Sequence, residues 1–179
     1  MCSFRAGKCD FIAIATHTRW GKSPDGREAE LGMLADWTDS HFNAKGAEDR
    51  DLIVMGDFNI PALDDALFKA LTRRGLQLPD SLRTLKAGRK VVKGSNLGQT
   101  QRYNQVLHLP TAAKRFSGAG GIVVFWGGGA ALKDLFLGTN YDAAKFTYQM
   151  SDHFPVWVQI NVDIDGDRLT QIVRSDEPK

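Results

Sequence analysis

The chain has few of the features that mark secreted or membrane proteins. It contains two cysteines, Cys2 and Cys9, in 179 residues, which is too few for a disulfide framework, so free thiols are expected. Its first residues, MCSFRAGKCDF, include charged side chains and no apolar core of a signal peptide. Its apolar runs are far shorter than a membrane span. These absences predict a protein with no membrane span and a cytoplasmic location.

The chain also lacks an excess of either charge. Lys and Arg total 23 and Asp and Glu total 21, giving a formal net charge of +2. That value does not indicate nucleic-acid binding by itself, and it does not oppose a polyanionic substrate. The length predicts a single domain over residues 1–173, followed by a tail over 174–179.

Apolar periodicities predict a layered α/β fold. Amphipathic helices are predicted at 27–44 and 62–75, with Gly75 ending the second, and a short helix or turn at 132–136. The stretch 79–99 is polar and basic and is predicted to be a long surface loop. Helices are expected to cover sheet faces. Strands are predicted at 10–17, 52–56, 102–110, 117–129 and 153–162.

Polar side chains follow or precede several of these strands. In DLIVMGDFNIP the apolar run 52–55 leads directly into Gly56, Asp57 and Asn59. A carboxylate and a carboxamide at a strand end are unusual choices for plain packing, although both residue types also favour turns. Because strand ends of layered folds converge on one rim, these side chains are expected to meet there. The other polar residues at strand ends are His17, Tyr103, Asn104, Asp152 and His153.

This set of residue types is suited to phosphate-ester hydrolysis. Carboxylate and carboxamide oxygens can hold a hard cation such as Mg²⁺. A histidine beside a carboxylate can transfer a proton or stabilise developing negative charge. The metal would neutralise phosphate charge while a base activates water and donors hold the non-bridging oxygens.

Three ordered motifs carry a family resemblance. THTRWG (16–21), GDFN (56–59) and SDHFP (151–155) resemble, in sequence and spacing, motifs of the endonuclease/exonuclease/phosphatase superfamily, the DNase I-like group. The resemblance implies a four-layered α/β sandwich. It also implies phosphoesterase activity dependent on Mg²⁺ or Mn²⁺, with the site at one rim of the sheets.

The resemblance assigns roles residue by residue. Asp57 would orient or activate the attacking water, and Asn59 would hold the phosphate or that water. Asp152 would bind the metal, with Asp57 and Asn59 as further candidate ligands. His153 would be the acid/base or transition-state-stabilising histidine, and His17 would donate a hydrogen bond to the phosphate.

Asn104 departs from the family pattern. Tyr103 and Asn104 occupy the place of a Tyr-Asp pair whose aspartate orients the histidine of the Asp-His motif. A carboxamide can accept a hydrogen bond from that histidine, but it cannot stabilise an imidazolium as a carboxylate does. We therefore expect reduced activity or a different balance of roles between His17 and His153.

Basic and aromatic residues near the motifs have two interpretations each. Arg19, Arg102 and Tyr103 could contact substrate phosphate oxygens, although single basic residues in loops are more often solvated. The basic stretch 83–94 could face a nucleic acid or simply be solvated. The four tryptophans are expected to pack in the core, although Trp20 could line the site. His41 and His108 match no motif and are expected to be structural or surface residues.

The family's earlier strands carry an Asn and a metal-binding Glu that the sixteen residues before His17 cannot supply. The chain thus resembles the C-terminal part of the domain, with the N-terminal part missing. Exposed sheet surface is then expected to promote self-association.

The leading hypothesis is a metal-dependent phosphoester hydrolase of nuclease-like type. Its substrate would be a phosphate ester, with nucleic acid, phospholipid head group and small ester all left open. A second hypothesis is a degenerate member that binds a phosphate-containing ligand without cleaving it. A third, a module with no site, leaves the three ordered motifs unexplained.

Overall fold

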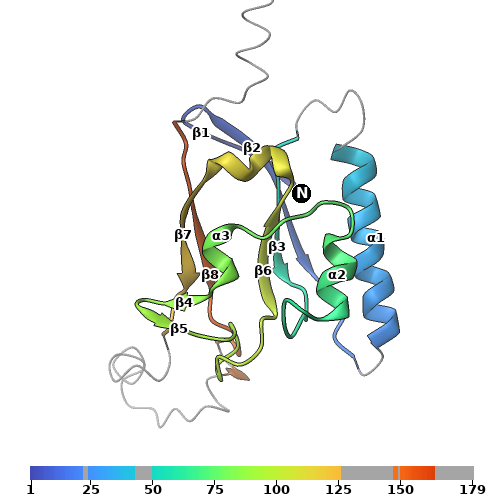
Figure 1. Ribbon diagram of the computed structural model, residues 1–179, viewed down its shortest axis with the longest axis vertical. Helices are drawn as coiled ribbons and strands as arrows, with labels where there is room; N and C mark the ends of the chain where they lie inside the picture. Colours follow the sequence, from blue (N-terminus) through green and yellow to red (C-terminus); the bar gives the residue numbers. More distant parts are fainter. Residues whose placement is uncertain (22–23, 43–49, 126–146, 149, 164–179) are drawn as a thin grey trace, which may run out of the picture.

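Two mixed four-stranded sheets pack face to face, and two helices cover the outer face of the first sheet (Figure 1). The computed structural model describes residues 1–21, 24–42, 50–125, 147–148 and 150–163. The strand order is β1-β2-β3-β6 in the first sheet and β5-β4-β7-β8 in the second. The predicted α/β class with helices on a sheet face is confirmed.

The strands are β1 (Cys2–Ala6), β2 (Cys9–His17), β3 (Leu52–Asp57), β4 (Lys86–Ala87), β5 (Lys90–Val91), β6 (Asn104–His108), β7 (Phe116–Ile122) and β8 (Val156–Ile160). The helices are α1 (Pro24–Phe42), α2 (Ala66–Thr72), α3 (Asp80–Arg83) and a 3₁₀ helix (Pro110–Arg115).

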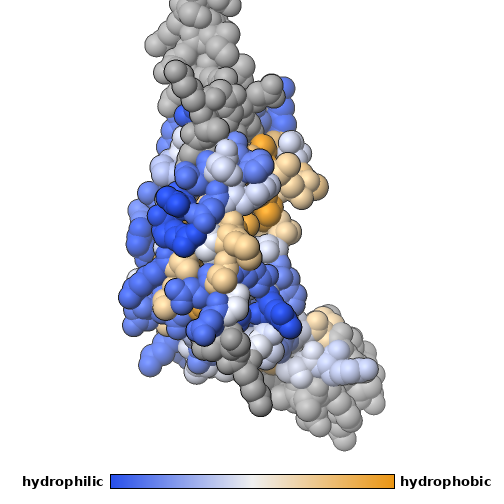
Figure 2. Space-filling model, turned by 90° about the vertical axis from the view of Figure 1, so that its right-hand side faces the viewer, coloured by the Kyte–Doolittle hydropathy of each residue, from blue (hydrophilic) through white to orange (hydrophobic). Residues whose placement is uncertain are grey.

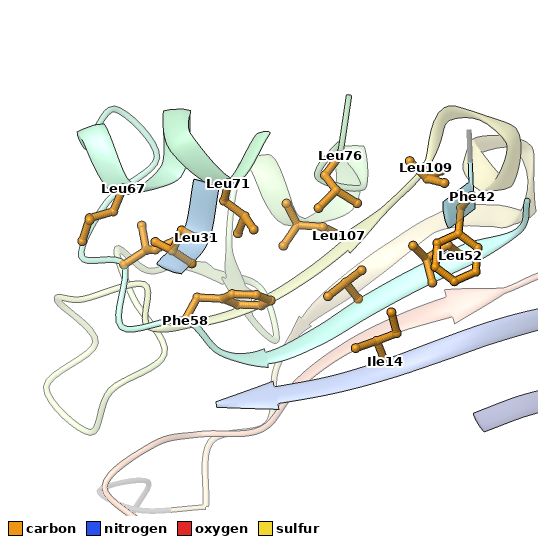
Figure 3. Packing of buried hydrophobic residues seen from close by; sticks show 12 residues of the cluster. Ile14, Leu31, Phe42, Leu52, Phe58, Leu67, Leu71, Leu76, Leu107 and Leu109 are labelled. Carbon is orange, nitrogen blue, oxygen red and sulfur yellow. The ribbon is translucent and has the colours of Figure 1, made fainter. Parts of the chain in front are cut away.

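The first core lies between the two longest helices and the first sheet. Leu31 of α1, Leu71 of α2, Leu52 of β3 and Leu107 of β6 are fully buried members of one cluster, in which Leu71 lies near Leu107 and Leu52 near Phe42 (Figure 3). Burying a leucine stabilises the fold by about 2 kcal/mol. This helical layer fixes one face of the first sheet and leaves its other face for the second sheet.

The second core lies between the sheets. Alternation along β3 directs Ile53 away from the helices, and Ile53 clusters with Val106 of β6 and Ile122 of β7. The residues of β8 alternate: Val156, Val158 and Ile160 pack inward, while Trp157 and Gln159 are exposed. The inner faces of both sheets therefore meet along β3, β6, β7 and β8.

The prediction of a surface loop over 79–99 is wrong. This stretch contains α3, β4 and β5, and it contributes Leu82, Leu85 and Val92 to the second core. Single apolar residues among basic ones anchor elements of only two to four residues, which are too short to generate a recognisable periodicity.

Other predicted boundaries shift by a few residues. The second helix begins at Ala66, because Asp65 accepts a hydrogen bond from the Leu67 N–H and caps it. Arg73 is the C-cap, and Gly75 follows at a φ of 99°. The strand predicted at 117–129 spans Phe116–Ile122. The element predicted at 132–136 lies outside the described residues.

The tryptophans are more exposed than predicted. Trp20 is 63% exposed, Trp37 37% and Trp157 43%, and Trp126 lies outside the described residues. Trp157 sits on the outer face of β8, and Trp37 lies on α1 beside the His41 ring. On the face that carries α1, hydrophilic side chains predominate, with apolar ones scattered among them (Figure 2).

All five residues of β1, an outer strand of the first sheet, are exposed; self-association through this sheet stays a prediction. Cys2 and Cys9 are both free, as expected. Among the described helices, none has the length and apolar character needed to cross a membrane.

Candidate functional site

Three predicted site residues form a row across the first sheet. His17 is the register partner of Asp57 in the parallel β2–β3 pair, and Asp57 is the partner of Asn104 in the antiparallel β3–β6 pair. Alternation from Ile53 places Asp57 on the face of the sheet that packs on the second sheet. The carboxyl ends of β2 and β3 and the amino end of β6 thus converge at one rim, as the sequence predicted.

The GDFN segment is tied to the end of β2. The side-chain Nδ2 of Asn59 donates to the Thr18 carbonyl oxygen at 2.8 Å. The Thr18 backbone N–H donates to the Asp57 carbonyl oxygen at 2.9 Å. Gly56 has a φ of 148°, and a Cβ there would lie 1.8 Å from the Thr16 oxygen. Only glycine therefore allows β2 and β3 to approach this closely.

Asn59 has a local role in shaping the Asp57 side chain. It adopts a φ of 53°, a left-handed conformation that asparagine tolerates better than most residues. In that conformation its N–H donates to Asp57 Oδ1 at 2.9 Å. The Asn59 side chain is only 4% exposed. The backbone hydrogen bond from Asn59 thus fixes the orientation of the Asp57 carboxylate and leaves Oδ2 facing the histidines.

Two histidines approach the same carboxylate oxygen. His17 Nε2 lies 3.6 Å from Asp57 Oδ2, and His153 Nδ1 lies 3.5 Å from it. Both distances are within ion-pair range but longer than a good hydrogen bond. The His17 side chain is 74% exposed, whereas those of His153 and Asp57 are 13% and 22% exposed. Asp57 is therefore flanked by one open and one enclosed imidazole.

His153 comes from the second sheet, where the chain enters β8. It forms an isolated bridge with Asn96. The neighbouring Phe154 N–H donates to the Ser95 oxygen at 2.6 Å, and the Leu97 N–H donates to the Asp152 oxygen at 2.9 Å. These backbone bonds hold the SDHFP motif against residues 95–97. The distant motifs of the sequence therefore meet at one place.

Asp152 is brought to the site but stays open to solvent. Its Oδ2 lies 3.9 Å from His153 Nε2, and its side chain is 74% exposed. The His153 ring is thus approached by a carboxylate at each nitrogen, Asp57 at Nδ1 and Asp152 at Nε2. An imidazole placed in this way is suited to carry positive charge during a reaction.

An aromatic group borders the histidine. The Tyr103 ring lies 5.3 Å from the His153 ring and 5.7 Å from the Trp20 ring, in an edge-on arrangement with the latter. The Arg27 guanidinium lies 5.7 Å from the centroid of the Trp20 ring and donates to the Asn59 carbonyl oxygen at 3.2 Å. The position of Arg27 could not be predicted from sequence, because no motif distinguishes it from the other charged residues of α1.

Asn104 does not contact His153 by a hydrogen bond. Its backbone N–H donates to Ser95 Oγ at 3.1 Å. Its side-chain Oδ1 is buried and has no hydrogen-bond partner within the described part of the chain. Asp57 instead is the carboxylate beside the Nδ1 of His153.

No contact links Arg19 or Arg102, the two candidate phosphate-binding arginines, to Asp57 or the histidines within the described residues. The Arg102 guanidinium donates to the carbonyl oxygens of Leu82 and Arg83, and burial lowers its pKa. These contacts give Arg102 a structural role in holding α3. Arg19 is exposed, and its backbone N–H donates to Glu30 Oε2 at 3.1 Å.

The donor set offers two carboxylates to a metal ion. Asp57 and Asp152 each carry a solvent-accessible carboxylate at the rim. The side chain of Asn59, the third predicted ligand, is buried and donates to Thr18. Across the described ranges, no three His, Cys, Asp or Glu side chains are grouped as a ready-made metal centre. Mg²⁺ in proteins often uses only one or two carboxylates and completes its shell with water and substrate phosphate.

Comparisons with protein-family profiles and with curated proteins found no match to this chain.

Proposed function

We propose that this protein hydrolyses phosphate esters with the help of a divalent metal ion, Mg²⁺ or Mn²⁺. The observation that supports the proposal is the position of Asp57, whose free carboxylate oxygen lies between His17 and His153. Two sheets contribute to this arrangement, and its residues come from all three motifs that resemble the endonuclease/exonuclease/phosphatase superfamily.

The proposed chemistry divides the roles between the open and the enclosed histidine. The exposed His17 is accessible to a substrate and would donate a hydrogen bond to a non-bridging phosphate oxygen. Asp57 would accept a proton from the attacking water. His153, held between two carboxylates, would stabilise the negative charge that develops in the transition state.

The carboxylates of Asp57 and Asp152 fit a hard cation, and either could hold it together with water and phosphate oxygens. The ion would supply positive charge to neutralise the phosphate. Asn59 would act through Asp57, because its N–H fixes the orientation of that carboxylate.

The test measures hydrolysis of bis(p-nitrophenyl) phosphate and p-nitrophenyl phosphate with Mg²⁺, with Mn²⁺ and with EDTA. We expect metal-dependent turnover that falls by about 10²–10⁴-fold in His153→Ala and Asp57→Asn, the usual loss for acid–base residues. His41→Ala is the matched control, since His41 is an exposed histidine at the other end of α1 from the site. Equal activity of all variants, or turnover unaffected by EDTA, would contradict the proposal.

A non-catalytic phosphate-binding role is the alternative. The unpartnered Oδ1 of Asn104, where the family pattern has a carboxylate, favours it. Phosphate or nucleotide binding that depends on His17 and His153, with no turnover on either ester, would support this second candidate.

A further inference from the structure

The β4–β5 hairpin carries a concentrated positive charge. Residues 83–94 contain five basic side chains and no acidic one. Arg83 pairs with Asp80 of α3 at 2.9 Å. The other four are exposed and form no ion pair with any residue in the described ranges; they are Lys86, Arg89, Lys90 and Lys93. In a chain with a net charge of +2, such a segment is a local electropositive surface.

This hairpin lies close to the proposed site. Ala87 of β4 pairs with Ile122 of β7, and Ile122 pairs with Val156 of β8. These residues form one row, so β4 lies two strand spacings, about 10 Å, from the start of β8. His153 precedes that start by three residues. The hairpin and the carboxyl ends of β2 and β3 lie at the same end of the molecule (Figure 1).

The backbone connects the hairpin to the site directly. The segment that follows β5 runs into Ser95 and Asn96, which pair with Phe154 and His153. The ring contacts continue from His153 to Tyr103 and from Tyr103 to the exposed Trp20. A basic segment, the candidate acid–base residues and an exposed aromatic ring therefore follow one another along the same rim.

We propose that the β4–β5 hairpin binds the phosphate backbone of a single-stranded nucleic acid that continues past His153, so that a base further along the strand stacks on Trp20. The proposal rests on the proposed function, since it names the substrate class of that site. A nucleic acid without its complementary strand exposes both a regular row of phosphates and the flat faces of its bases. A basic surface and an open indole ring on the same rim match these two features. An anionic membrane surface would be attracted by the charge alone and gives no role to Trp20. The hairpin exposes one large apolar side chain, Val91, that could contact lipid.

The experiment measures binding of a fluorescein-labelled 20-nucleotide single-stranded DNA by anisotropy, in EDTA and over a series of salt concentrations. The double variant Arg89→Gln/Lys90→Gln is compared with Arg5→Gln/Lys69→Gln, which removes one Arg and one Lys elsewhere on the surface. In the hairpin variant we expect the Kd to rise about tenfold. The slope of log K against log salt should fall in magnitude by about 1.4, which is 0.7 for each of two contacts. The control pair should leave both unchanged.

Trp20→Ala tests the stacking contact. Its Kd should rise about tenfold while the salt slope stays constant, because a neutral ring releases no counterions. Melting curves of each variant check that these exposed positions leave the fold intact; Lys90→Gln/Lys93→Gln provides a second hairpin pair if the first is unstable.

Three outcomes would overturn the proposal. One is no salt-dependent binding of the DNA by the unmodified protein, and another is an equal loss in the hairpin and control pairs. The third is preferential binding to phosphatidylserine vesicles over the DNA. Hydrolysis of the small esters reports on the proposed function separately, since the hairpin variant should retain it. Ester turnover without DNA binding would therefore reject the hairpin role alone, whereas DNA binding without ester turnover would reject only the hydrolase.

Discussion

At position 104 a neutral carboxamide lies directly across from Asp57 in the β3–β6 register. Its buried Oδ1 has no hydrogen-bond partner in the described part of the chain. A buried polar atom in this state costs free energy. The position thus combines a local energetic penalty with a place beside the proposed acid–base residues.

Asn104→Asp is predicted to raise the rate of ester hydrolysis. The introduced carboxylate would stabilise the imidazolium form of His153. Position 104 lies across from Asp57, whose Oδ2 is 3.5 Å from His153 Nδ1, so the new charge would act through space. Because a nearby opposite charge favours the charged form of an ionisable group by about 1.4 kcal/mol or more, we expect the rate to rise by about tenfold. The measurement is kcat/KM on bis(p-nitrophenyl) phosphate as a function of pH.

Asn161→Asp is the control for Asn104→Asp, since it adds the same charge to an exposed position after the far end of β8. A fall in rate in Asn104→Asp, with Asn161→Asp unchanged, would refute the assigned role of position 104.

Site residues could be predicted from sequence where they stand at the end of a recognisable strand. Asp57 and His17 directly end apolar strands, so their convergence could be inferred from sequence. The hydrogen bond by which Asn59 orients the Asp57 carboxylate could not be inferred from sequence. It depends on a left-handed backbone conformation at Asn59, which the residue type alone does not specify. The contacts of Arg102 could not be predicted either, because its acceptors, the carbonyls of α3, belong to an element that the sequence did not reveal.

At the scale of elements, α2 begins with a side-chain cap, which makes its stability testable. Asp65→Ala removes the acceptor of the Leu67 N–H, 2.8 Å away, and should lower the free energy of unfolding by about 1 kcal/mol. Asp64→Ala removes a neighbouring carboxylate that is exposed and should change it by less than about 0.5 kcal/mol. Urea unfolding followed by circular dichroism measures both; equal values for the two variants would contradict the capping role.

Long elements with a clear period were predictable, and short ones were not. The helix α1 and the strands β2 and β3 follow from apolar spacing within the chain itself. By contrast β4 and β5 have two residues each, and their pairing with β7 is set by partners far along the chain. Local pattern carries little information on such pairings. The error at 79–99 has this cause, and it concealed the hairpin on which the nucleic-acid proposal depends.

At the scale of the whole molecule, His108 couples stability to pH. It is 3% exposed, and its Nδ1 lies 2.8 Å from the Leu109 carbonyl oxygen. Burial lowers its pKa; the Leu109 carbonyl and Asp80 oppose this and Arg83 adds to it. The unfolded chain therefore binds a proton that the folded chain does not, once the pH falls below about 6.5.

The prediction is that stability decreases as the pH falls from 7.5 to 5.5, and that His108→Gln reduces this decrease. The loss of stability between the two pH values should therefore be smaller in His108→Gln than in the unmodified protein, because the variant has no imidazole to protonate on unfolding. The measurement is the urea midpoint at both pH values, with His41→Gln, an exposed histidine, as control. The same pH dependence in all three proteins would show that His108 does not contribute.

The overall arrangement followed from sequence only in its coarse form. Early strands alternating with helices predicted an α/β protein with helices on a sheet face. The face-to-face packing of two sheets was expected from the family resemblance, not from periodicity, because it is produced by contacts such as Ile53 with Ile122 that join distant segments.

The β1–β2 hairpin places the two thiols of the chain in opposite surroundings. Cys2 lies exposed on the outer strand, whereas Cys9 is fully buried and burial raises the pKa of its thiol. A thiolate-directed reagent will therefore modify Cys2 at once and reach Cys9 only when this hairpin opens. The rate of the slow phase of such labelling therefore reports how often one edge of the first sheet opens.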